Sequence, residues 1–242
     1  VGCPPGTLAN NFWPAFGNTL FFTLVTVLLE TILGIGMALV MANDFHGRGL
    51  LRAAVLVPWA IPTAITAKLW AFLFSEQGIV NSIFHAHVAW QTDPWAARFS
   101  IILADVWKTT PFMALLILAG LQMIPKDLYE AARMDGANAW QRFTRITLPL
   151  AKNSIIVAVL FRMLDALRMY DLPYIMVGPN PDSPTATLSQ LVVAAIRQDH
   201  VNAASALSTL IFLLIFLIAL CFVKSLGSKV AHQAEPVVAE EE

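Results

Sequence analysis

Long apolar runs alternate with short polar stretches along the whole chain. A helix needs about 20 mostly apolar residues to cross a bilayer. Five runs meet this requirement, at 19–42, 50–75, 98–121, 153–177 and 203–224. The first is interrupted only by Glu30, whereas the second, third and fourth carry proline or charge. The pattern predicts an all-α polytopic membrane protein with about five transmembrane helices.

Composition supports the same class. Of the 242 residues, 57% are hydrophobic and 13% are charged, against about 25% charged residues in soluble domains. The net charge of −1 provides no field for binding nucleic acid. Cys3 and Cys221 lie near opposite ends, so neither a disulfide framework nor a metal site is expected from them. His85 and His87 alone are too few for a zinc site.

The basic residues of the loops predict the orientation, because cytoplasmic loops carry an excess of Lys and Arg. With five spans, segments 43–52, 122–152 and the chain after 223 share one side. Their basic residues are Arg48, Arg52, Lys126, Arg133, Arg142, Arg145, Lys152, Lys224 and Lys229. The opposite side has only Arg98 and Arg197. We therefore expect 1–18 outside, a membrane domain over 19–224, and a disordered cytoplasmic tail over 225–242, so that the C-terminus is cytoplasmic.

The stretch 122–150 is polar although it lies between two spans. Pro125 suits a helix start and Gly136 a helix stop, which predicts a short helix between them. Asn138 can cap a second helix, which Pro149 is expected to end just before the fourth span. Spacing alone is equally compatible with a helix that docks a partner protein and with an amphipathic helix on lipid headgroups.

A sequence pattern decides between these two interpretations. Glu130-Ala131-Ala132, three residues, Gly136, nine residues, and then Ile146-x-Leu148-Pro149 resembles the EAA loop of permease subunits in binding-protein-dependent ABC importers. The resemblance implies that the loop is the coupling helix that seats in a cleft of an ATPase subunit. It implies roles at this contact for Glu130, Ala131, Ala132, Asp135, Gly136, Ile146, Leu148 and Pro149.

The resemblance extends over nearly the whole chain and is greatest to the maltose-type sugar permeases. It implies a type I ABC importer permease fold in a bacterial cytoplasmic membrane, with a further N-terminal span preceding this sequence. It also implies import of a sugar, a disaccharide such as trehalose or maltose, by alternating access. The partners it implies are a second homologous permease, two ABC ATPases, an extracytoplasmic solute-binding protein and membrane lipid.

ATP hydrolysis is expected on the partner subunits. A P-loop needs a Gly-Lys dipeptide within its phosphate cradle, and the sequence contains none. We therefore expect this chain to be a transport subunit without catalytic residues or cofactors, with ATP and Mg²⁺ bound by separate ATPases.

Charged groups inside the expected spans are candidates for a solute pathway, because charge at membrane depth is costly and usually faces a cavity or a partner. Asp105 and Lys108 are three residues apart and are expected to pair. A hydrophilic pathway for a polyhydroxylated solute is one interpretation, and pairs that hold helices together are the other. The pathway candidates are Lys108, Asp165, Arg168, Asp105, Arg162, Tyr170 and Asp171.

Two other classes of function remain open. An ion-driven secondary transporter or a channel for a small polar solute would explain the charges inside the spans, but it does not explain the EAA pattern. An intramembrane enzyme would need a catalytic pair, and the sequence shows none above chance. Pro58, Pro62 and Pro111 are expected to break or kink their spans in any of these classes.

Overall fold

The computed structural model of the protein describes residues 7–85 and 87–231, with side chains for 10–85 and 87–224. Every regular element within these residues is a helix. The helices are α1 (Thr7–Ala42), α2 (Arg48–Ala60), α3 (Thr63–Leu73), α4 (Ile79–Phe84), α5 (Pro94–Gln122), α6 (Lys126–Met134), α7 (Ala139–Arg142), a π-helical turn η1 (Phe143–Thr147), α8 (Leu148–Ala166), α9 (Asp171–Met176), α10 (Leu188–Arg197) and α11 (Val201–Ala231). The expected all-α class is confirmed.

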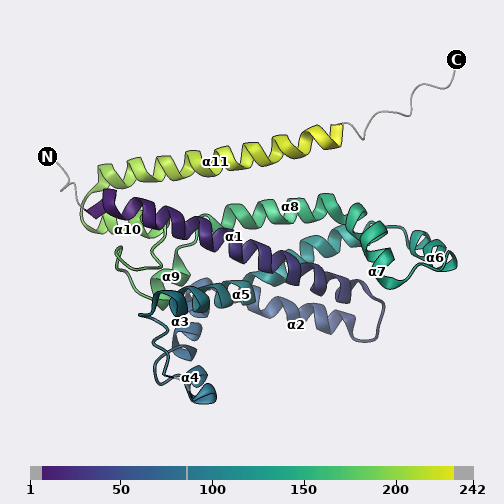
Figure 1. Ribbon diagram of the computed structural model, residues 1–242, viewed down its shortest axis with the longest axis horizontal. Helices are drawn as coiled ribbons and strands as arrows, with labels where there is room; N and C mark the ends of the chain where they lie inside the picture. The colour runs from purple at the N-terminus through teal and green to yellow at the C-terminus, as the bar shows by residue number, and fades with distance from the viewer. Residues whose placement is uncertain (1–6, 86, 232–242) are drawn as a thin grey trace.

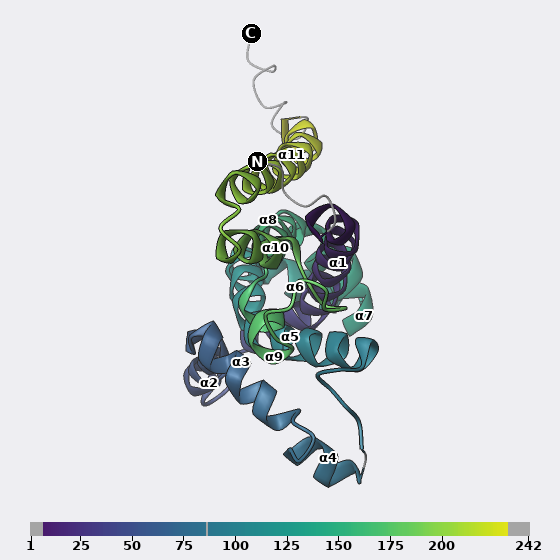
Figure 2. The same ribbon diagram turned by 90° about the vertical axis from the view of Figure 1, so that its left-hand side faces the viewer.

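The centre of the molecule is α5, which packs along α1 and α8. Figures 1 and 2 show these helices running together, with α11 along one side and α3 and α4 projecting on the other. Ile101, Met113 and Ile117 of α5 are fully buried. Asp93 caps α5 by accepting hydrogen bonds from the backbone of Trp95 and Ala96 at 3.0 and 2.8 Å.

Small residues let α5 approach its neighbours closely. A Cβ added at Gly34 of α1 would lie 3.1 Å from the Met113 Cβ. A Cβ added at Gly120 would lie 2.1 Å from the Ser154 Oγ of α8. Close backbone approach at small residues is the usual basis of helix packing inside membranes. Glycine at the closest contacts therefore allows α1, α5 and α8 to pack against one another.

Four described helices are long and apolar enough to cross a membrane, or up to five if a bent pair counts as one span. The expected spans 19–42, 98–121 and 203–224 lie inside α1, α5 and α11. The expected span 50–75 is wrong as a single helix, because α2 and α3 meet at 87°. The break falls at Ile61 and Pro62, the latter preceding the first residue of α3.

The expected break is found at Pro62, but the other two prolines do not break their helices. Pro58 lies inside α2 and Pro111 inside α5, and neither helix is interrupted there. The expected span 153–177 is also wrong in its bounds. The apolar helix runs from Ala139 to Ala166, and a turn then separates it from the short α9.

The expected domain boundaries fall inside helices. Residue 18, the expected end of the external segment, lies within α1, which begins at Thr7. The C-terminal helix continues past residue 224 as far as Ala231, so part of the expected disordered tail is helical. Residues 1–6 of the expected segment and 232–242 of the expected tail lie outside the described residues.

Candidate functional site

The polar stretch between α5 and α8 forms a helical hairpin beyond one end of the bundle (Figure 1). Its first helix, α6, ends at a turn in which Gly136 has φ +76°, a value that glycine adopts without steric cost. The backbone N–H of Ala137 donates to the carbonyl of Ala132 at 2.9 Å. Asn138 and Gln141 then form a reciprocal capping box at the start of α7. The predicted helix, turn and second helix are confirmed.

The second half of the hairpin is continuous with the span that follows. The helix passes from α7 through η1 into α8 without a break. Pro149 does not end it, contrary to expectation. This proline occupies the first turn of α8, directly after the π-helical turn, and the first turn is the part of a helix in which proline is tolerated. Ile146 is half-buried and Leu148 is exposed at this junction.

Two side-chain contacts hold the hairpin to the rest of the chain. Lys126 at the start of α6 donates to the Asp44 carboxylate at 2.8 Å, linking α6 to the end of α1. The Tyr129 hydroxyl lies 3.0 Å from the Thr147 hydroxyl, linking α6 to η1. The hairpin is therefore tied to the start of α8 by a hydrogen bond as well as by the backbone.

The outer surface of the hairpin is exposed. None of the nine described residues of α6 is buried; Glu130 and Ala131 are exposed and Ala132 is half-buried. Asp135 and Gly136 of the turn are exposed as well. Two large apolar side chains project beside them, Met134 (89% exposed) and Trp140 (70% exposed). Apolar groups next to an acid, outside the bundle, form a surface suited to a protein partner.

A buried ionic cluster joins α1, α5 and α8. The Arg162 guanidinium donates to both Glu30 oxygens, at 2.5 and 3.0 Å, and to Asp165 at 3.1 Å. It also pairs with Asp105. Thr109 donates to Glu30 at 2.6 Å. Arg162 is 2% exposed, so its charge is satisfied inside the protein rather than by water.

The expected pair of Asp105 and Lys108 is wrong. Asp105 pairs with Arg162, whereas the Lys108 ammonium donates to the backbone carbonyl of Ile61 at 2.6 Å and to that of Trp59 at 3.4 Å. These carbonyls end α2 at the break before α3, where they have no helical partner. A cation at a helix C-terminus is also favoured by the helix dipole. Lys108 therefore stabilises the break between α2 and α3.

The seven pathway candidates line one hollow of about 150 Å³. Arg168 and Asp165 are largely exposed, with side-chain accessibilities of 67% and 64% and 4.0 Å between their charged groups. Tyr170 stacks on Tyr174 with 4.9 Å between ring centroids. The hollow thus contains both buried charged residues, Arg162 and Asp105, and exposed ones, Asp165 and Arg168.

Other residues at this hollow escaped prediction from the sequence. Thr63, Thr109, Met169 and Leu172 also line it. Thr109 lies four residues after Asp105 on α5, a spacing that identifies it as a neighbour on the same face. Thr63 lines the hollow because the chain breaks at Pro62, as expected from the proline; the direction in which α3 leaves the break could not be predicted from the sequence.

The comparisons with known proteins agree on one family. A model of the family described as "Binding-protein-dependent transport system inner membrane component" matches residues 30–232. The trehalose/maltose transport system permease protein of Thermococcus litoralis is 44% identical over 221 residues, covering 89% of this chain and 75% of the relative. The trehalose transport system permease protein of Mycobacterium tuberculosis is 39% identical over 219 residues, covering 90% and 71%.

A solved structure is similar as well. It is a bacterial alginate ABC transporter in complex with a periplasmic protein that carries an alginate pentasaccharide. One chain of it matches with a TM-score of 0.75 and 27% identity, covering 88% of this chain and 76% of that chain.

Proposed function

Because the chain belongs to the family of binding-protein-dependent transport system inner membrane components, we propose that it is a permease subunit of an ATP-driven importer. Its solute in this proposal is a sugar, a disaccharide such as trehalose or maltose. The proposal rests above all on the exposed α6–α7 hairpin, which carries the complete EAA pattern and continues directly into a span.

The continuous helix supplies a mechanical route. Residues 139 and 162 are separated by about 35 Å at the helical rise of 1.5 Å per residue. A partner that pushes α6 and α7 therefore moves the helix that carries Arg162 and Asp165 at the hollow. Glu130, Ala131, Ala132, Asp135 and Gly136 are the proposed contact with the ATPase. Ile146, Leu148 and Pro149 fix the hairpin to the span.

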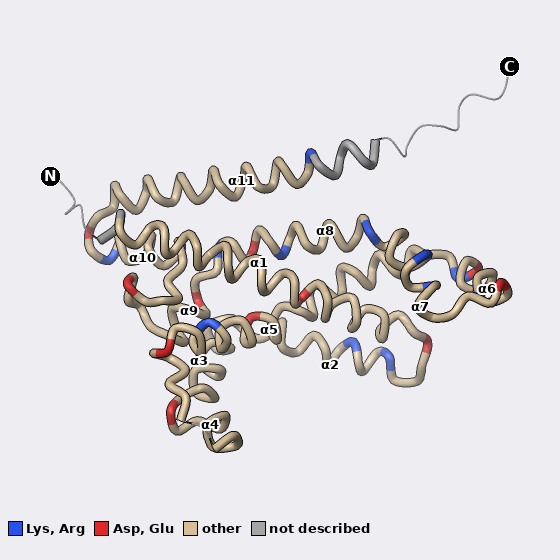
Figure 3. The backbone as a smooth tube through the Cα atoms, viewed as in Figure 1, with Lys and Arg blue, Asp and Glu red and all other residues tan. Residues whose placement is uncertain are grey.

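The hairpin is proposed to lie in the cytoplasm. Figure 3 shows Lys and Arg gathered at the end of the bundle that carries α6, α7 and the start of α2. This end therefore faces the cytoplasm, as the positive-inside rule requires, and the C-terminal end of α11 lies on the same side. The chain itself provides no phosphate cradle, so ATP and Mg²⁺ belong to separate ATPase subunits.

A sugar is the solute that fits best. Two relatives at 44% and 39% identity are named for trehalose or trehalose/maltose transport. Sugar hydroxyls both donate and accept hydrogen bonds. The hollow offers donors in Lys108 and Arg168 and acceptors in Asp165 and Asp171. With Asp105, Arg162 and Tyr170 behind or beside them, these residues form the proposed solute pathway.

The size of the hollow supports a second permease subunit. Its volume of about 150 Å³ is below the roughly 300–1,000 Å³ of most small-molecule sites. A disaccharide would need a second wall, which a homologous permease in a heterodimer supplies. A solute-binding protein delivers the sugar from outside, as in the alginate transporter complex.

Docking of the ATPase tests the proposal. The chain is purified with its partners as wild type, Glu130→Arg, Gly136→Pro and Glu76→Arg. The first two variants disturb the exposed hairpin, and Glu76 is an exposed acid outside it that serves as the charge-matched control. We expect the ATPase to be lost from the two hairpin variants and kept by Glu76→Arg. Retention of the ATPase in all of them would overturn the proposed coupling role.

A further inference from the structure

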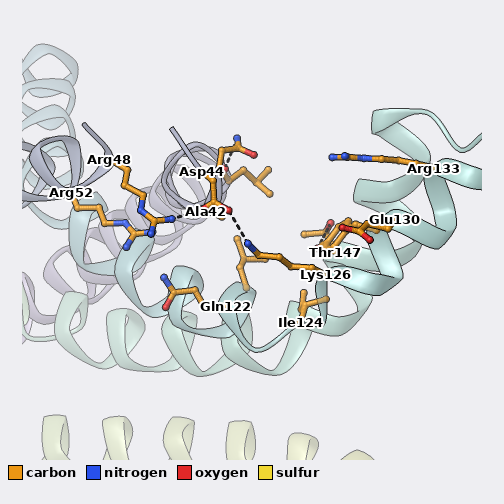
Figure 4. A pocket seen from close by; sticks show the side chains of 14 residues that line it. Ala42, Asp44, Arg48, Arg52, Gln122, Ile124, Lys126, Glu130, Arg133 and Thr147 are labelled. Atoms are coloured by element: carbon orange, nitrogen blue, oxygen red, sulfur yellow. Dashed lines mark hydrogen bonds and ion pairs between the residues drawn. The ribbon is translucent and has the colours of Figure 1, made fainter. Parts of the chain in front are cut away.

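A second, larger hollow lies between the hairpin and the end of the bundle. Its volume is about 860 Å³. The ends of α1 and α5, the start of α2 and one side of α6 enclose it (Figure 4). It shares no residue with the solute pathway, and Glu130 is its one lining residue from the proposed ATPase contact.

Four basic side chains line this hollow: Arg48, Arg52, Lys126 and Arg133. In Figure 4, Arg48 and Arg52 extend into it from one wall and Arg133 from the opposite wall. Two acids, Asp44 and Glu130, also line it, which leaves cations in excess by two. The hollow therefore attracts an anion.

Two of the cations retain unused donors. Arg52 donates from Nη2 to the carbonyl of Met41 at 2.6 Å, but its Nε is buried and has no hydrogen-bond partner among the described residues. A buried donor without an acceptor is costly. Arg133 forms no ion pair with any residue that the structure describes. Both guanidiniums thus have donors left over, and they line the hollow from opposite sides.

Part of the lining of the hollow is apolar and consists of Leu39, Leu121 and Ile124, which together are called its floor. It lies where α1 and α5 end and α2 begins, at the level where spans leave the hydrocarbon core. A hollow with an apolar floor and basic walls at this level matches a phospholipid, whose phosphate lies directly above its glycerol and acyl chains. An acidic surface of a protein partner would not require the apolar floor.

We propose that this hollow binds the phosphate group of an anionic phospholipid, held by Arg52 from α2 and Arg133 from α6. The inference rests on the proposed function, which places this end of the bundle at the cytoplasmic leaflet. Arginine suits the role because its planar guanidinium binds phosphate oxygens in pairs. A bound phosphate links α2 to the hairpin across the hollow.

Asp44 competes with this ligand. Its carboxylate pairs with Lys126 at 2.8 Å and with Arg48. The hydrogen bond and charge of Lys126, with the charge of Arg48, hold the pKa of Asp44 below its usual range, so the carboxylate stays ionised at neutral pH. Removing this charge releases two cations to the phosphate.

The test is lipid binding to the purified transporter complex, without ATP or sugar. Native mass spectrometry counts phosphatidylglycerol and phosphatidylcholine bound during titration in detergent. The variants are Arg52→Gln and Arg133→Gln, with Lys152→Gln as control, because Lys152 is exposed at the same end but outside the hollow. Asp44→Asn is compared with Asp127→Asn, an acid of α6 that does not line the hollow.

We expect phosphatidylglycerol affinity to fall about fivefold for each arginine removed, the contribution of one basic residue near an anionic membrane surface. Lys152→Gln and Asp127→Asn should leave it unchanged, and Asp44→Asn should raise it. Phosphatidylcholine should bind weakly to every form. Arg133→Gln is informative even if Arg52→Gln fails to fold, because Arg133 is exposed.

Three outcomes would overturn the inference. Equal losses of phosphatidylglycerol affinity in Arg133→Gln and Lys152→Gln would show non-specific attraction between the lipid and basic residues. Displacement of the lipid by excess inorganic phosphate would show a site for free phosphate. Loss of the ATPase from Arg133→Gln, with phosphatidylglycerol binding intact, would assign the cluster to protein docking. None of these readouts depends on transport, so they are separate from failure of the proposed function.

Discussion

Arg162 unites three helices through ion pairs to Glu30, Asp105 and Asp165. Replacement by methionine leaves the buried Glu30 and Asp105 carboxylates without their cation. Removing one partner of a buried ion pair costs about 3–5 kcal/mol. We therefore expect Arg162→Met to lower the melting temperature of the purified complex strongly.

Arg168→Met is the matched control, because Arg168 is largely exposed and 4.0 Å from Asp165. Exposed ion pairs contribute less than about 1 kcal/mol. Equal losses of stability in the two variants would contradict the structural role of the buried cluster.

The same cluster shows where prediction from sequence ends for single residues. Spacing on one helix suggested that Asp105 pairs with Lys108, and it identified both as unusual charges in a span. It contains no information on which other helix lies opposite. Arg162 is 57 residues away from Asp105, and Ile61 is 47 away from Lys108, so only the packed bundle assigns these partners.

At the scale of elements, the contact of α5 with α8 depends on Gly120. A Cβ there would meet the Ser154 Oγ at 2.1 Å and the Ser154 Cβ at 2.3 Å. We expect Gly120→Ala to destabilise the complex by about 1–3 kcal/mol through overpacking. Gly36→Ala is the control, since nothing lies within 4 Å of its added Cβ. Thermal melting measures both, and a stable Gly120→Ala variant would show that the helices do not approach this closely.

The continuity of α7, η1 and α8 has a separate consequence. Arg145 lies inside η1 and is exposed, so Arg145→Ala preserves the helix. Arg145→Pro interrupts it at a cost of about 3 kcal/mol. We expect Arg145→Pro to retain the ATPase and its basal hydrolysis while sugar uptake is lost.

Arg145→Ala should keep both hydrolysis and uptake. The two rates are compared in the same proteoliposomes. If uptake continues at its normal rate in Arg145→Pro, the helix is not the element that transmits motion.

Three of the expected spans fall inside single helices because each is a long apolar run, and Pro111 within the third does not break α5. The break at Pro62 was predicted from the proline, but its angle of 87° was not, since hydropathy is the same for a straight span and for two helices at that angle. The hairpin was predictable from Gly136 and Asn138, whose backbone requirements are local. Its continuity into α8 was not, because Pro149 is tolerated only in the first turn next to the π-helical segment.

At the scale of the whole molecule, the chain has an exposed hairpin, the proposed contact with the ATPase, at one end and a partly open polar hollow along the bundle, joined by one helix. Neither part completes a transporter alone. The hollow is smaller than a sugar site, and the hairpin has no nucleotide chemistry of its own. The proposed function therefore requires partners at both places, which an ion-driven carrier would not.

The most direct measurement is uptake of radiolabelled trehalose by proteoliposomes that contain the complex and its solute-binding protein. It compares ATP inside with an ion gradient alone, for wild type and Gly136→Pro, whose φ of +76° proline cannot adopt. We expect uptake only with ATP, and its loss in Gly136→Pro. Uptake driven by the ion gradient without ATP, unchanged in the variant, would contradict the account.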